Sequence, residues 1–256
     1  VFSGGGFTSH AFYAFGAETG RLEWQAGAPD GGPTSAIVED DKVLYNTESC
    51  TLFVVDARTG RQLWCRWLGD PLMSAPAAAN GVVYAGHIAS GGAYAMTAMR
   101  LSNGEVVWTR PLPADVLSAP VIVGGSIFAT TMDGHVYRLD ARTGDERWAK
   151  DLGATSAPWV DGDRLYLSRR RTVNREQQIV LSAANGGILS AGAILPAPYA
   201  TNRPDTGGVA AGWGYEGSRP VLAGGRAYFA MGGELRARDL RTGEEVWRRR
   251  YSGSSG

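Results

Sequence analysis

A repeated motif runs along almost the whole chain and limits its possible folds more than any other feature. Each copy has Asp or a small residue, two variable residues, Thr-Gly or Asn-Gly, three variable residues and Trp. Successive motif glycines are 40, 44, 40, 42 and 57 residues apart. The glycines are Gly20, Gly60, Gly104, Gly144, Gly186 and Gly243, and the copies end at Trp24, Trp64, Trp108, Trp148, Ser190 (a degraded copy) and Trp247. A fixed period near 40 residues indicates a repeat architecture.

A second motif keeps a constant phase with the first. It reads Ser-Ala-Pro, about four residues, Gly, and a β-branched and aromatic pair, as in SAPAAANGVVY from Ser74. Further copies begin at Ser118 and Ser156, with variants from Ser35 and Ser218. In the third unit, alternating residues at 82–86, 93–101 and 106–111 predict three strands after the Ser-Ala-Pro strand. Each unit is therefore expected to hold four strands.

The glycine motif has the residues of a tight hairpin turn between the last two strands. Asp56, Asp140 and Asp239 can accept hydrogen bonds from the following backbone, and the glycine supplies a positive φ. The Trp then opens the outer strand and offers its ring to a neighbouring sheet. We therefore interpret the repeated tryptophans as structural residues.

Four-stranded units of this length are expected to close as blades of an all-β β-propeller, because one unit cannot bury both faces. About six blades are predicted in a single domain over residues 1–251, with 252–256 as a flexible tail. The first blade is incomplete, because Val1 and Phe2 align with Val83 and Tyr84. We expect either a native chain that continues upstream or a three-stranded first blade.

The element at 237–247 resembles the Trp-docking repeat of the pyrroloquinoline-quinone (PQQ)-like β-propeller family. It reads Ala-Arg-Asp-Leu-Arg-Thr-Gly-Glu-Glu-Val-Trp. That family includes bacterial quinoprotein dehydrogenases, sensor domains and an outer-membrane assembly protein. The resemblance implies a periplasmic or extracellular protein, although this chain shows no signal peptide. A PQQ enzyme would need the quinone, a divalent ion and in many cases adjacent cysteines, which are absent here. No cofactor is therefore expected, with PQQ and a bound ion as the alternative.

Charge argues against two classes of partner. The 25 basic residues, nearly all arginine, are balanced by 25 acidic ones, so no overall field favours nucleic acid. No apolar run is long enough for direct membrane insertion. The arginine runs at 169–171 and 248–250 are expected either to lie at a solvent-exposed edge or to contact an acidic surface of a partner.

Functional residues are expected on one face, because tight turns occupy the other and every unusually long loop falls on the first. These loops cover residues 87–92, 169–178 and 190–217; the last is either an inert loop or an aromatic cover. The candidate contacts for a ligand or partner are Glu48, His87, Asp133, Arg169, Arg171, Tyr199, Arg203, Trp213 and Tyr215. No nucleophile or metal motif accompanies them, so no catalytic residue is assigned.

The sequence predicts a non-enzymatic scaffold that binds a protein through this loop-rich face. The alternatives are a quinoprotein-like or sugar-active enzyme that uses the central channel, and a sensor or assembly domain of a longer bacterial protein. Cys50 and Cys65 flank the Gly60 turn, where Cys65 is expected opposite Leu52. A disulfide would then require a bulge that shifts the register, and two independent thiols are the other reading.

Overall fold

The computed structural model describes most of the chain as β-strands and connecting loops. Its described residues are 2–4, 10–16, 19, 21–33, 36–69, 75–89, 91–173, 175–196, 221–223, 225–231, 234–239, 241–242 and 244–250. Within these ranges every regular element is a strand. No helix capable of crossing a membrane occurs among them. The all-β prediction is confirmed.

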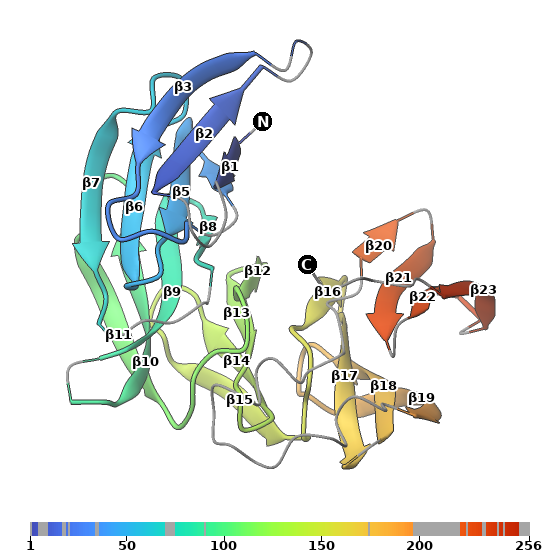
Figure 1. The fold of residues 1–256 in the computed structure, drawn as a ribbon. Coiled ribbons are helices and arrows are strands. Elements are labelled where there is room, and N and C mark those ends of the chain that lie inside the picture. Colours follow the sequence, from blue (N-terminus) through green and yellow to red (C-terminus); the bar gives the residue numbers. More distant parts are fainter. Residues whose placement is uncertain are drawn as a thin grey trace. The chain divides into compact units, whose positions relative to one another are not determined.

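The strands form six antiparallel sheets, each built from consecutive strands (Figure 1). The first sheet has three: β1 (Phe2–Gly4), β2 (Ala11–Phe15) and β3 (Leu22–Gly27). The second comprises β4 (Ile37–Glu39), β5 (Lys42–Asn46), β6 (Thr51–Asp56) and β7 (Gln62–Trp67). The third comprises β8 (Ala77–Ala79), β9 (Val82–Ile88), β10 (Tyr94–Arg100) and β11 (Val106–Leu112). The fourth comprises β12 (Val121–Val123), β13 (Ser126–Thr130), β14 (His135–Asp140) and β15 (Glu146–Asp151).

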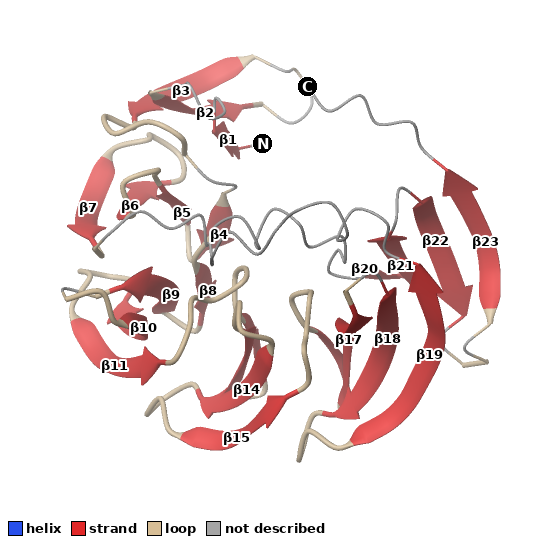
Figure 2. Ribbon diagram, turned by 60° about the horizontal axis from the view of Figure 1, so that its bottom comes forward, coloured by secondary structure: helices blue, strands red, loops and turns tan. Residues whose placement is uncertain are grey.

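The fifth sheet comprises β16 (Trp159–Asp161), β17 (Arg164–Thr172), β18 (Arg175–Ser182) and β19 (Ile188–Pro196). The sixth comprises β20 (Val221–Ala223), β21 (Arg226–Met231), β22 (Glu234–Asp239) and β23 (Glu245–Arg250). Five sheets thus have the four strands predicted for a unit, and the incomplete first unit is also confirmed. Figure 2 shows the strands in red and the connecting loops in tan.

The chain divides into two compact units. The first unit contains residues 1–125 and 141–145, and the second contains residues 126–140 and 146–256. The prediction of a single domain over 1–251 stays a prediction.

The motif tryptophans join one repeat to the next through a repeated hydrogen bond. In the first unit the indole Nε1 of Trp24 donates to the carbonyl oxygen of Ala57 at 3.0 Å, and that of Trp64 donates to Leu101 at 2.9 Å. Trp108 donates to Ala141 in the first unit, and Trp148 donates to Ala183 in the second. Each acceptor lies at the start of the next repeat's glycine turn. These four hydrogen bonds link each of these tryptophans to the repeat that follows it.

The glycine of that turn gives the indole ring its space. Gly60 has a φ of 70°, and a Cβ added there would lie 2.6 Å from Trp24 Cε3. Gly104 and Gly144 stand in the same relation to Trp64 and Trp108, at 2.8 and 2.7 Å. Positive φ and close approach therefore both require glycine at this position.

The aspartates organise the turns as expected. Asp56 accepts hydrogen bonds from the backbone N–H groups of Arg58 and Thr59 and from the Thr59 hydroxyl. The Thr59 bonds lower the pKa of this exposed carboxyl. Asp239 accepts the two equivalent backbone bonds from 241 and 242. The carboxylate of Asp140 accepts a hydrogen bond of 2.6 Å from the guanidinium of Arg147.

Each of these hairpins contains a bulge just before the Trp, and the bulge changes the expected register. Trp64 pairs with Val54 and Gln62 with Val55, so Leu63 is the extra residue. Cys65 consequently pairs with Phe53, and the expected pairing with Leu52 is wrong. The bulge carries Cys65 away from Cys50 along the ladder. Neither cysteine forms a disulfide; Cys50 is buried and Cys65 is exposed.

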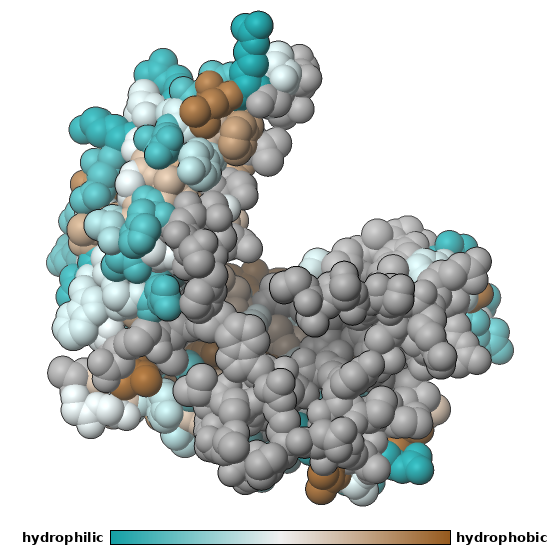
Figure 3. Space-filling model, viewed as in Figure 1, coloured by the Kyte–Doolittle hydropathy of each residue, from teal (hydrophilic) through white to brown (hydrophobic). Residues whose placement is uncertain are grey.

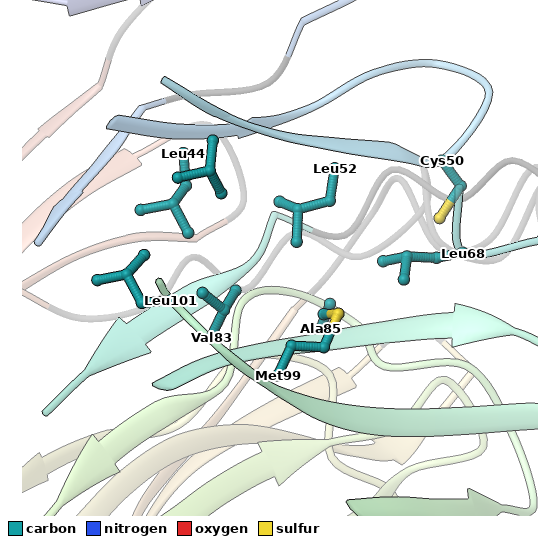
Figure 4. Close-up of a cluster of buried hydrophobic side chains, with 9 residues drawn as sticks. Leu44, Cys50, Leu52, Leu68, Val83, Ala85, Met99 and Leu101 are labelled. Carbon is teal, nitrogen blue, oxygen red and sulfur yellow. The ribbon is translucent and has the colours of Figure 1, made fainter. Parts of the chain in front are cut away.

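Apolar side chains fill the space between neighbouring sheets of the first unit. Figure 4 shows Leu44 and Leu52 of the second sheet facing Val83, Met99 and Leu101. All five side chains are at most 2% exposed. This burial explains why β5, β6, β9 and β10 have almost continuous buried runs, whereas the outer strands β7 and β11 are mostly exposed or partly exposed.

Gly60→Ala tests the requirement for glycine under the indole, with Gly81→Ala as its control. Gly81 has a φ of 73°, but an added Cβ would meet nothing within 4 Å. The control should lose only the ~1–2 kcal/mol cost of the left-handed conformation. Gly60→Ala should lose measurably more in urea denaturation, because the Trp24 ring must move. Equal losses would contradict the docking role.

Trp64→Ala and Trp67→Ala compare two tryptophans on one strand. Trp64 docks on the next turn, whereas Trp67 is 65% exposed. Trp64→Ala should lower the free energy of unfolding by ~3–5 kcal/mol. Trp67→Ala should cost well under half of that in the same denaturation experiment, and a larger loss would show that β7 is held by its exposed ring.

Candidate functional site

The fifth sheet departs from the repeat at the ends of its strands. β17, β18 and β19 contain 9, 8 and 9 residues, whereas β13, β14 and β15 of the same unit contain 5, 6 and 6. The extra length carries the connection between β17 and β18, which the sequence places on the loop-rich face. We name residues 169–177 the basic hairpin, because they include Arg169, Arg170, Arg171 and Arg175.

A hydrogen-bond network fixes the base of the basic hairpin. Arg169 donates from Nε and Nη2 to Gln177 Oε1 at 3.1 and 2.9 Å. Gln177 Nε2 in turn donates to the carbonyl oxygen of Gly192 on β19 at 2.8 Å. Partial burial and the nearby Arg171 charge lower the pKa of Arg169. The network ties all three long strands together and holds Arg169 in a fixed plane.

The other arginines of the basic hairpin are exposed to solvent. Arg170, Arg171 and Arg175 are exposed, and Val173 at the tip is 70% exposed. Glu176 is the sole carboxylate in this sequence segment. It is 2% exposed, so it offers no carboxylate at the surface of the hairpin. The hairpin thus offers an exposed apolar residue at its tip and three exposed arginines close to it in the sequence.

Glu176 is a buried carboxyl that the sequence analysis did not single out. Its Oε2 and the Oγ1 of the buried Thr155 both lack a hydrogen-bond partner among the described residues. Burial raises the pKa of Glu176, and the nearby Thr155 and Arg170 offset only part of that effect. Its strand position gave no signal, because it lies beside exposed arginines in a segment expected to be a loop.

Asp133 lies in the turn between β13 and β14 of the second unit. Its Oδ1 accepts a 2.6 Å bond from Thr131 Oγ1, and its Oδ2 lies 3.0 Å from His135 Nδ1. Partial burial alone would raise the pKa of Asp133, but the bonds from Thr131 and from the His135 backbone together lower it. Asp133 is therefore a charged and locally satisfied group.

The first unit contains the two remaining described candidates. Glu48 is exposed in the loop between β5 and β6, where its N–H donates to Gly31 O at 3.1 Å. His87 is only 8% exposed on β9, and its Nε2 lies 2.8 Å from Thr97 Oγ1. Burial lowers the pKa of His87. The structure thus places His87 beneath the surface, where it supports the sheet, and not in a loop.

The remaining candidates, Tyr199, Arg203, Trp213 and Tyr215, lie outside the described residues, as do the repeat glycines Gly20 and Gly243. The structure therefore gives no geometry for the expected aromatic cover. Trp247 is described and partly buried on β23.

The described residues do not supply the ligands that a PQQ-associated metal would need. Over the described ranges, no group of three or more His, Cys, Asp or Glu side chains could hold a metal ion. His10, for example, is exposed, and its Nδ1 lies 3.1 Å from the carbonyl oxygen of Pro29. We derive no chemistry from a quinone for this chain.

Residues 8–99 and 86–256 both match the family model of the outer membrane protein assembly factor BamB. The chain belongs to the BamB family. The BamB of Yersinia pestis is 26% identical over 192 residues, which cover 69% of this chain and 47% of the relative. The BamB of Escherichia coli K12 is 28% identical over 126 residues, 45% of this chain and 30% of the relative. The chain thus spans about half or less of these curated relatives.

Solved structures confirm the β-propeller fold of this BamB-family chain. BamB from Moraxella catarrhalis has a TM-score of 0.65 at 17% identity, covering 94% of this chain and 70% of that one. A quinohemoprotein alcohol dehydrogenase from Comamonas testosteroni has a TM-score of 0.70 at 14% identity, covering 98% and 59%. At these identities the likeness establishes the fold alone, and it does not assign chemistry.

Glu176→Gln tests the buried carboxyl beneath the basic hairpin. Because burial raises the pKa of Glu176 in the folded chain, the folded state keeps the proton to higher pH than the unfolded state does. The free energy of unfolding should therefore decrease as pH rises from the ordinary glutamic acid range through the raised pKa. Glu176→Gln should be more stable than the parent at about pH 8, and the difference should shrink in acid.

Glu244→Gln is the control, because Glu244 is an exposed carboxyl of the second unit. Its unfolding free energy, measured by urea denaturation across the same pH series, should follow the parent. A Glu176→Gln profile parallel to the parent at every pH would show that Glu176 does not titrate with folding.

Proposed function

We propose that the chain is a non-enzymatic scaffold that binds a protein partner through its loop-rich face, with the basic hairpin as the main contact. The observation that carries the proposal is the tip of the fifth sheet, where Val173 and three neighbouring arginines are exposed and the carboxylate of the segment is buried. Arginine forks match carboxylate geometry and suit planar, bidentate contacts. The chemistry that fits is an acidic protein surface with an apolar patch.

The rigidity of the support favours a binding role. Arg169, Gln177 and Gly192 connect the three long strands, so little ordering is required when a partner arrives. The surface of the first unit in Figure 3 is mostly hydrophilic or neutral with scattered hydrophobic residues. Scattered apolar residues of this kind do not mark an interface.

Membership of the BamB family supports a role in protein assembly. The curated relatives are named for the assembly of outer membrane proteins. We propose that this chain contributes to the same process in the bacterial periplasm, where it would hold a protein component and need no cofactor. Glu48 and Asp133 are proposed as secondary contacts at the loop ends, together with Tyr199, Arg203, Trp213 and Tyr215 in the long insertion.

Site-specific photo-crosslinking tests this proposal in the bacterium that encodes the chain. A photoreactive phenylalanine replaces Val173 at the tip, and in the control it replaces Val123, which is 41% exposed in the first unit. The Val173 probe should form an adduct with a discrete protein, identified by mass spectrometry, and the Val123 probe should not. Absence of a tip adduct, or equal adducts from both probes, would contradict the proposal.

Charge reversal then tests the role of the arginines. Arg171→Glu with Arg175→Glu should reduce the tip adduct roughly tenfold, because each exposed ion pair contributes up to ~1 kcal/mol and reversal adds repulsion. Arg164→Glu with Arg226→Glu changes the net charge equally at other exposed arginines and should leave the adduct unchanged. An equal effect of both pairs would indicate nonspecific attraction and refute a localised contact.

A further inference from the structure

β19 differs from every other outer strand of the described sheets in its charge. The others contain Glu23 in β3, Arg66 in β7, Arg110 in β11, four charged residues in β15 and four in β23. β19 reads ILSAGAILP and has none. Charged side chains on an edge strand are the usual protection against pairing with another chain. β19 therefore lacks a protection that the other repeats keep.

β19 is also an accessible edge. It is the last strand of its sheet and pairs with β18 on one side only. Ile188, Leu189 and Ile194 are 47, 56 and 44% exposed, and the residues between them are exposed or partly exposed. A long strand with unpaired backbone groups and apolar side chains is a template for a further strand.

Two bulges shape this edge. One lies at Leu189, at the position common to the repeats, and the other lies between the partners of Gln177 and Ile179. Bulges can turn an edge away from pairing. Here the second bulge is held by the bond from Gln177 to the Gly192 carbonyl, which keeps the end of β19 joined to the basic hairpin.

We propose that β19 accepts an extended segment of a partner protein as an added antiparallel strand. The segment has apolar or small residues along β19 and acidic residues at its N-terminal end. The proposal rests on the proposed function in one respect, that the partner is a protein, and it names a surface distinct from the hairpin tip.

Charge complementarity determines the direction of the added strand and which of its ends is acidic. Arg175 pairs with Pro196, and Arg169 bonds to Gln177 opposite Ile194, so positive charge gathers where β19 ends. An added strand lies two strand spacings from β18, about 10 Å, which is about one Debye length at roughly 0.1 M salt. In an antiparallel strand the N-terminal residues lie at that end.

A second copy of this chain is a poorer fit for the same edge. Two antiparallel β19 strands would bring the arginine end of one copy to the beginning of the other. Residues 183–188, which precede and open β19, are Ala-Ala-Asn-Gly-Gly-Ile and contain no acidic side chain. Such a pair would have no partner for the arginines.

The test uses a fluorescent probe peptide, Asp-Asp-Thr-Val-Thr-Val-Thr-Val, with the full chain. We expect saturable binding by anisotropy, together with slower hydrogen exchange of the backbone amides of β19. A matched peptide N-methylated at alternate residues keeps its side chains but loses one hydrogen-bonding edge, and it should not bind. A Lys-Lys peptide in place of Asp-Asp should bind more weakly.

Leu189→Lys should weaken peptide binding about tenfold, because the charge enters the edge that the added strand covers. Val107→Lys is the matched control, since Val107 is the bulged, 43% exposed residue of β11 and corresponds to Leu189 in the repeat. The Lys variants replace exposed side chains, and circular dichroism checks that both fold.

The outcomes separate this proposal from the proposed function. Equal binding of the N-methylated peptide, or unchanged exchange in β19, would overturn strand addition. A chain that dimerises without peptide and is made monomeric by the β19 variant would assign the edge to a second copy and also overturn it. Failure of the tip crosslinks with intact peptide binding would refute the basic hairpin as the contact and leave strand addition standing.

Discussion

The contact between each indole ring and the glycine turn of the following repeat is the constraint on which the fold depends. A small residue with a positive φ brings backbone against the ring, and the indole N–H satisfies a carbonyl at the start of the same turn. Larger side chains at the glycine would separate neighbouring sheets. At the four described contacts, one pair of residues therefore sets how closely the sheets pack and fixes the spacing at which the buried strands can fill the space between them.

Much of this was predictable from the sequence. Trp and Gly at a fixed spacing predicted the sheets and the turns, because the physical requirement for each residue is local. The alignment of Val1 and Phe2 with Val83 and Tyr84 predicted the incomplete first unit. The register was not predictable: the bulge at Leu63 is an extra residue that strand alternation does not reveal, and it made the expected Cys65 pairing wrong. His87 was expected in a loop because the strand was assumed to be shorter than the structure has it.

The candidate site was predicted less completely than the fold. The arginine run indicated the correct segment, but the burial of Glu176 and the Arg169–Gln177–Gly192 network depend on contacts among three strands. Such contacts follow from tertiary packing and have no signature along the chain. Departures from the repeat gather in the fifth sheet, which has Ser190 in place of Trp, longer strands and an uncharged outer strand. Violations of an otherwise consistent pattern commonly mark functional positions.

The docking contact also has a direction along the chain. The indoles of Trp24, Trp64, Trp108 and Trp148 reach carbonyls 33, 37, 33 and 35 residues further on. During synthesis a finished sheet therefore keeps its tryptophan undocked until the following turn has left the ribosome, a delay of about 2–7 s at typical elongation rates. The last finished repeat of the nascent protein thus has an undocked tryptophan and an uncovered apolar face. Docking proceeds repeat by repeat from the N-terminus.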